Sequence, residues 1–210
     1  MGYSPVITRL IEELARLPGI GSKTAERLAF YIVRSPETEV SGLVAAIEAV
    51  KRGIRPCSVC YSPGETDPCP ICIDPRRERD VVCVVEEPKD LLSIEKVGSY
   101  RGLFHVLMGS LSPIEGVEPD DLTISDLLKR VEKEGIKEVI LATNPTTEGD
   151  CTSLYIVERL RHLNVKVTRL ARGIPAGSHL EFASRAILSD ALLGRTAFDN
   201  DGPSDAAEVP

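Results

Sequence analysis

The sequence predicts a multi-domain α/β protein, and three observations along the chain predict it. A helical pattern occupies the first 55 residues, four cysteines gather in one short segment, and buried strand patterns then alternate with helical ones. Strands that alternate with helices at this spacing predict a parallel sheet with crossover helices. We therefore expect four successive regions and a tail, at 1–55, 56–75, 79–174, 175–198 and 199–210.

The N-terminal region is expected to contain three helices. Apolar residues recur at helical spacing over 4–17 and again over 22–35, with Ser4 and Ser22 as candidate N-caps. A third helix is expected over 40–52, where Gly53 ends it.

The turn between the first two helices is typical of contact with phosphate. Gly19 and Gly21 permit tight backbone conformations and the close approach of another molecule, while Ile20 is expected to pin the turn. The helix that follows offers unpaired N–H groups and a positive dipole end, and Lys23 and Arg27 add charge one turn apart. This is the helix-hairpin-helix signature of DNA binding without sequence preference; the alternative is a plain helical connection.

Four cysteines form two Cys-x-x-Cys pairs that predict a structural zinc site. Cys57 and Cys60 are separated by eight residues from Cys69 and Cys72. Two such knuckles complete a tetrahedron of thiolates with no position open for water or substrate, so we expect a small zinc-ribbon-like finger. The prolines of this segment prevent a core of its own, so the metal would supply its folding free energy. Redox dithiols or unrelated free cysteines are the alternative.

The α/β region has polar residues at two strand ends, where parallel sheets place their sites. Glu86 ends an apolar run, and the stretch from Leu141 to Asp150 passes from a second strand into a loop and helix. The pattern resembles the Toprim domain, which joins a strand-end Glu to an Asp pair that holds Mg²⁺. Asn144 and Thr146 stand where the two aspartates belong, which removes two anionic ligands. We therefore expect no catalysis, although a residual metal near Glu86 stays open.

Hydrophobic patterns in this half also predict its individual elements. The expected strands lie at 81–85, 103–108, 138–142 and 165–171, and the expected helices lie at 90–97, 125–134, 151–163 and 179–195.

Charge is distributed unevenly along the chain. The formal charge of −7 argues against nucleic acid, yet four acidic residues lie in the 199–210 tail, which is expected to be disordered. Residues 1–55 carry eight Lys and Arg against six Glu, so the basic excess is local. With neither a secretory signal nor a long apolar run, we expect a cytoplasmic, nucleoid-associated protein without a membrane partner.

The order of helix-hairpin-helix, four-cysteine site and Toprim domain without its Asp pair resembles the RecR family over residues 4–195. The resemblance implies a DNA-binding recombination mediator: a ring-shaped homotetramer on double- and single-stranded DNA that acts with RecO and RecF to load RecA on single-stranded gaps. It also implies that a Toprim surface around Glu86 and Glu148 meets these proteins. Two alternatives remain, a Mg²⁺-dependent Toprim nuclease or topoisomerase and a protein scaffold that does not bind DNA.

One motif departs from the family pattern. Ser184 and Arg185 stand where the family has an acidic cluster, which puts any nucleotide-linked role in doubt. His179, Glu181 and Arg195 are expected at the surface or an oligomer interface, and His105 is expected to be a hydrogen-bonded structural residue.

Overall fold

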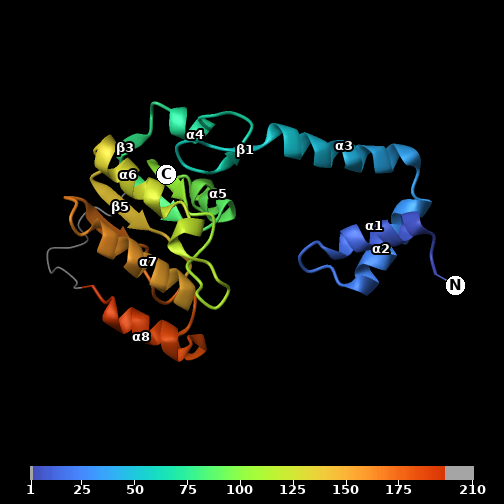
Figure 1. Ribbon diagram of the computed structural model, residues 1–210. Coiled ribbons are helices and arrows are strands. Elements are labelled where there is room, and N and C mark those ends of the chain that lie inside the picture. Colours follow the sequence, from blue (N-terminus) through green and yellow to red (C-terminus); the bar gives the residue numbers. More distant parts are fainter. Residues whose placement is uncertain (1, 197–210) are drawn as a thin grey trace. The chain divides into compact units, whose positions relative to one another are not determined.

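The computed structural model describes residues 2–196, which form two compact units (Figure 1). The first unit holds the chain up to Pro56 together with residues 63–67, and the second holds residues 57–62 and the chain from Pro68 onward. The cysteine segment is thus divided between the two units. The tail expected at 199–210 lies outside the described residues. Within residues 2–196, no helix is long and apolar enough to cross a membrane.

The first unit is helical, as expected. Its helices are α1 (Pro5–Ala15), α2 (Ser22–Arg34) and α3 (Glu37–Gly53), and a short hairpin follows from β1 (Arg55–Pro56) and β2 (Pro63–Gly64). Ala25 and Ala29 are fully buried on α2, because small side chains one turn apart let α1 pack closely against it. Tyr3 packs edge-on against Phe30, with ring centroids 5.0 Å apart.

The helix starts of this unit differ from the expectation. Neither Ser4 nor Ser22 caps a helix through its side chain: Ser4 occupies the N-cap position of α1 without such a bond, and the N-cap of α2 is Gly21. Helix α3 begins three residues earlier than expected, at Glu37, because acidic residues in the first turn suit the positive end of the helix dipole.

The second unit is built on a parallel sheet in the order β4-β3-β5-β6. The strands are β3 (Glu78–Val85), β4 (Gly102–Val106), β5 (Glu138–Leu141) and β6 (Lys166–Arg169). The central strand β3 pairs on both sides, where Cys83 lies opposite Phe104 of β4 and Ile140 of β5. This confirms the expected parallel α/β arrangement.

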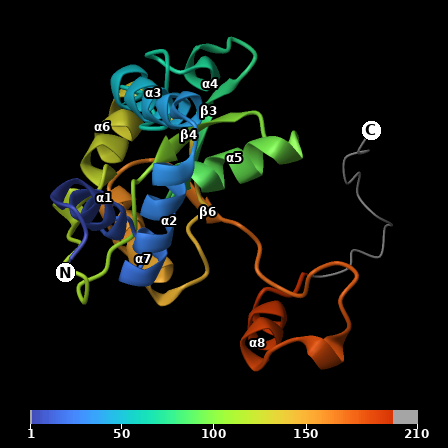
Figure 2. The same ribbon diagram turned by 90° about the vertical axis from the view of Figure 1, so that its right-hand side faces the viewer.

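Helices cover both faces of this sheet (Figure 2). On one face, α6 (Ile124–Glu134) and α7 (Thr147–Leu160) pack on the larger core, to which Val82, Val84 and Leu127 contribute. On the other face, α5 (Pro88–Val97) buries Leu91 against Phe104. The sheet therefore lies between two helical layers, with the carboxyl ends of its strands leading into loops.

Polar side chains cap several helices of this unit at their first turn. Helix α7 starts at Thr147 rather than at 151, because the hydroxyl of Thr146 accepts a hydrogen bond from the Gly149 N–H at 3.1 Å. The single helix expected over 179–195 is instead a 3₁₀ turn η2 (Leu180–Phe182) followed by α8 (Arg185–Leu193). Ser184 caps α8 by accepting from Ile187 at 3.3 Å. Two short elements were not expected, α4 (Pro70–Ile73) and η1 (Pro119–Asp121).

Candidate functional site

The turn between α1 and α2 has a conformation that its two glycines permit. Gly19 lies in the left-handed region with φ of +79°, and the N–H of Ile20 donates to the carbonyl of Leu17 at 3.0 Å. Gly21 is the N-cap of α2 in an extended conformation, and a Cβ added at either glycine would meet nothing within 4 Å. Another molecule can therefore approach this backbone closely.

The start of α2 combines free backbone donors with positive charge. No side chain caps its N-terminus, so the first N–H groups point outward with the positive end of the helix dipole. Lys23 and Arg27 are exposed and one turn apart, and among the described residues neither forms an ion pair. This arrangement suits the phosphate oxygens of a nucleic-acid backbone.

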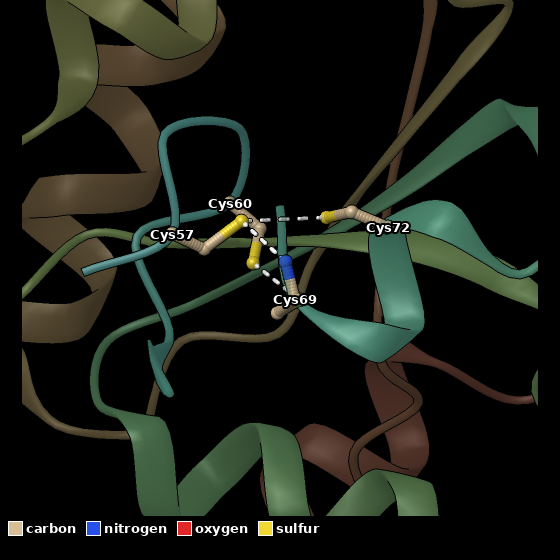
Figure 3. Close-up of side chains that lie close together, drawn as sticks. All are labelled: Cys57, Cys60, Cys69 and Cys72. Carbon is tan, nitrogen blue, oxygen red and sulfur yellow. Dashed lines mark hydrogen bonds between the residues drawn. The ribbon is translucent and has the colours of Figure 1, made fainter. Parts of the chain in front are cut away.

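The second unit brings together the four cysteines of the two Cys-x-x-Cys pairs, and their sulfur atoms lie within 4.8 Å of one another (Figure 3). The Sγ atoms of Cys57 and Cys72 are 3.9 Å apart, and those of Cys60 and Cys69 are 3.5 Å apart. Zn–S bonds of about 2.3 Å in a tetrahedron place sulfur atoms about 3.8 Å apart. The cluster therefore fits zinc, and its four protein ligands leave no position for a substrate.

The acid–base chemistry of the cluster also fits a cation. A hydrogen bond from Cys72 lowers the pKa of the Cys60 thiol to about 5, whereas burial raises the pKa of Cys69 to about 11. The charge of the Cys60 thiolate also raises the pKa of Cys69 and of Cys72, so without a metal one thiolate opposes the ionisation of its neighbours. A divalent cation removes this conflict because it favours four thiolates at once.

The first cysteine knuckle is attached to the sheet. The carbonyl of Cys60 accepts a hydrogen bond from the N–H of Val106 in the edge strand β4 at 2.8 Å. Tyr61, the next residue, has a φ of 65°, and its hydroxyl donates to Asp126 of α6 at 2.7 Å. This bond raises the pKa of Tyr61 to about 12, so the phenol stays protonated. Its ring packs edge-on against His105 at 5.4 Å.

A buried arginine strengthens the same attachment. The Nη1 of Arg130 donates to the carbonyl of Phe104 at 2.7 Å and to that of Val59 at 3.5 Å, while its Nε pairs with Glu134. His105 is fully buried with its Nε2 3.0 Å from the Thr123 carbonyl, and burial lowers its pKa to about 4. His105 is therefore a neutral structural residue, as expected. Nothing in the sequence marks Tyr61 or Arg130, because their contacts span 65 and 71 residues.

At the carboxyl ends of β3 and β5, the carboxylate of Glu86 is bound within the protein. Glu86 is 6% exposed, and its Oε1 accepts a hydrogen bond from the backbone N–H of Asn144 at 3.0 Å. Its Oε2 accepts a second from the side-chain amide of the same residue. The side chain of Asn144 thus places an amide donor where the Toprim pattern has a carboxylate. Thr146 uses its hydroxyl to cap α7, so neither replaced position offers an anionic ligand.

The two acidic residues that the resemblance assigns to a partner surface differ in their exposure. Glu86 faces inward, whereas Glu148 in the first turn of α7 is exposed. The neighbouring Asp150 pairs with Arg172, which lowers the pKa of this carboxyl. Of the two predicted residues, Glu148 is therefore the exposed one, and its contact with a partner stays a prediction.

Glycine is required at position 149 because the backbone there lies close to Asn144 and to the Glu86 carboxylate. A Cβ at this position would overlap the backbone oxygen of Asn144 and lie 2.7 Å from Glu86 Oε1. Gly149→Ala is expected to lower the free energy of unfolding by about 2–3 kcal/mol, because backbone cannot yield as a flexible side chain does. Chemical denaturation measures this loss.

Gly42→Ala provides the control for that variant. Gly42 lies inside α3 with nothing within 4 Å of an added Cβ, so alanine there should leave stability unchanged or raise it by up to about 1 kcal/mol. Equal effects of the two substitutions would show that the contact at Gly149 does not constrain the loop.

These features define a class of protein that combines a helix-hairpin-helix, a four-cysteine zinc finger and a Toprim fold without the Asp pair of its metal site. Comparisons with known protein families identify each of these three regions. Family models match residues 7–51 as the RecR helix-hairpin-helix, residues 54–74 as the RecR zinc finger domain with four cysteines, and residues 80–171 as a Toprim domain.

Relatives match along most of the chain. "Recombination protein RecR" of Bifidobacterium longum subsp. infantis is 52% identical over 195 residues, which cover 93% of this chain and 98% of that protein. The protein of the same name from Pelotomaculum thermopropionicum is 52% identical over 193 residues, covering 92% and 96%. That from Rhodopirellula baltica is 50% identical over 194 residues, covering 92% and 98%. The chain belongs to the RecR family, and its cofactor is a structural zinc ion.

Proposed function

We propose that the chain is a DNA-binding recombination mediator of DNA repair and not an enzyme. It would bind double- and single-stranded DNA without sequence preference and act in the cytoplasm, at the nucleoid. In this proposal it forms a homotetrameric ring and cooperates with RecO and RecF to load RecA on single-stranded gaps. Its domains would follow the limits 1–55, 56–75, 79–174 and 175–198, with Cys57, Cys60, Cys69 and Cys72 as the zinc ligands.

The proposal that the chain is not an enzyme is supported by the hydrogen bonds from Asn144 to Glu86. A Toprim enzyme needs Mg²⁺ to stabilise the leaving oxygen in phosphoryl chemistry, and Mg²⁺ needs anionic oxygen ligands. Here the buried carboxylate of Glu86 already accepts two hydrogen bonds from Asn144. The Toprim fold is thereby left as a scaffold that supports partner contact through Glu148.

The DNA-binding part rests on the turn from Gly19 to Gly21 with the exposed Lys23 and Arg27 on α2. Replacing both cations by glutamate is expected to weaken binding to labelled double- and single-stranded oligonucleotides by about tenfold or more at low salt. The slope of the logarithm of affinity against that of salt should flatten by about 2, because two phosphate contacts are lost. Fluorescence anisotropy over a salt series measures both.

The matched control reverses two cations elsewhere. Arg76 and Arg161 are exposed on the second unit and pair locally with Asp74 and Glu158. Arg76→Glu with Arg161→Glu changes the net charge equally, so an equal loss of affinity would remove the hairpin from the DNA contact.

Two further measurements test the alternatives. Nicking of supercoiled plasmid with Mg²⁺, abolished by Glu86→Ala, would overturn the non-enzymatic assignment in favour of a nuclease. A stable oligomer that binds no DNA even at low salt would identify a protein scaffold instead.

A further inference from the structure

The segment between β4 and α6 contains a tight turn, residues 111–117, that displays an exposed isoleucine; we call it the Ile114 turn. The N–H of Val117 donates to the Ser112 carbonyl at 2.9 Å, and the Ser112 N–H donates back at 3.2 Å. Gly116 has a φ of +74°, which lets the chain reverse within four residues. Ile114 at the tip is 96% exposed, more than any other large hydrophobic residue in the described chain.

The base of the Ile114 turn is fixed to the core. The N–H of Leu111 donates to the hydroxyl of Thr152, a fully buried residue of α7, at 2.8 Å. Leu111 and Val117 pack against the larger core, and Ser112 is buried. An apolar side chain on a rigid turn loses little conformational entropy when a partner covers it. Ile114 is therefore preorganised for contact, unlike an isolated apolar residue on a mobile loop.

The charge around the turn determines what can bind there. No Lys or Arg occurs between Arg101 and Lys129, whereas five acidic residues do: Glu115, Glu118, Asp120, Asp121 and Asp126. Glu115, the residue next to Ile114 in the chain, is exposed, and so is Asp120. This sign repels phosphate and so disfavours nucleic acid, while a cationic protein surface would be attracted and oriented. An apolar anchor surrounded by charge is the arrangement of an interface hot spot with a polar rim.

The Ile114 turn also adjoins the acidic surface assigned above to partner contact. The Thr152 hydroxyl that holds Leu111 donates in turn to the backbone carbonyl of Glu148 at 2.7 Å. The turn and Glu148 are therefore connected through one buried side chain.

We propose that the Ile114 turn docks a protein partner by inserting Ile114 into an apolar pocket rimmed by Lys and Arg. This proposal rests on the proposed function, because RecO and RecF, the proteins expected to carry such a pocket, are the partners named there. It goes beyond that function by naming the surface, its anchor residue and the chemistry of the partner.

Binding of the full-length chain to purified RecO, and separately to purified RecF, tests the proposal at about 50 mM and about 300 mM salt. Ile114→Ser is expected to weaken binding to at least one of them by about tenfold, without changing the thermal midpoint, because this side chain has no contacts to lose. Glu115→Lys should weaken the same complex mainly at low salt. Val97→Ser removes a side chain 72% exposed on α5 and should leave both complexes unchanged.

Failure of the Ile114 turn as a docking surface and failure of the mediator function give different results in these experiments. If wild-type protein binds a partner and Ile114→Ser binds it equally well, the Ile114 turn is not the docking surface, while the mediator function stands. If wild-type protein binds neither RecO nor RecF, both proposals of a partner fail, although DNA binding by the hairpin can still be observed. A change of DNA affinity or of oligomeric mass in Ile114→Ser would instead assign the turn to DNA or to a second copy of the chain.

Discussion

Replacing Cys60 with serine is expected to abolish stoichiometric zinc binding and to unfold the finger formed by residues 54–74. The finger has no apolar core apart from its four cysteines and the half-buried Val59 and Ile71 packed on them. Zinc binding in such sites contributes on the order of 10 kcal/mol, comparable to the whole stability of a domain. Zinc content by elemental analysis should fall from one ion per chain toward zero, and the finger amides should exchange rapidly with solvent.

The same variant should also loosen the edge of the sheet. The Cys60 carbonyl accepts from Val106, and Tyr61 donates to Asp126, so the first knuckle covers β4. Exchange of the Val106 amide should therefore accelerate together with that of the finger. Cys151→Ser is the control, because Cys151 is exposed and lies outside the cluster. A Cys60→Ser protein with a full zinc ion and an unchanged thermal midpoint would contradict this role.

Local patterns explain which features the sequence could predict. The cysteine spacing and the apolar run Val81–Val85 each lie within one short segment, and the structure places both as expected. The predicted start of α7 was wrong because the apolar pattern there is weak and the Thr146 cap starts the helix earlier. A similar cap at Ser184 starts α8 as a helix separate from the 3₁₀ turn before it. Each of these helix starts depends on a single hydrogen bond to a hydroxyl group. The spacing of apolar residues carries no information about such a bond.

Long-range contacts could not be predicted for a different reason. The sequence itself shows Asn144 and Thr146 in place of two carboxylates, and this replacement predicts that the metal site is missing. That the amide of Asn144 would turn toward Glu86 depends on the pairing of β3 with β5, which brings residues 58 apart into contact. Conversely, Glu86 was expected at a partner surface, yet the same contact directs it inward.

The substitution at this strand end that tests the metal site directly is Asn144→Asp. The substitution removes the amide that donates to Glu86 Oε2 and places a second carboxylate against one that is 6% exposed. Because Asn144 itself is exposed, water screens part of the new charge, and we expect unfolding to become easier by about 1–2 kcal/mol at neutral pH. Acidification that protonates the new carboxyl would give it back a donor toward Glu86, so the deficit should shrink as the pH is lowered.

Mg²⁺ distinguishes a metal site restored by this substitution from simple damage. Two adjacent carboxylates offer the anionic oxygens that Mg²⁺ requires, so millimolar Mg²⁺ should raise the thermal midpoint of Asn144→Asp but not that of the wild type. Thr146→Asp alone is the control for the loss of stability in the absence of Mg²⁺, because aspartate caps a helix about as well as threonine and this residue holds no bond to Glu86. If Asn144→Asp were as stable as the wild type at neutral pH without Mg²⁺, the hydrogen bond from the Asn144 side-chain amide would not be what holds the Glu86 carboxylate in place. The absence of the Asp pair would then still remove metal chemistry, but the loop would have to be held by the backbone bond and the Gly149 contact instead.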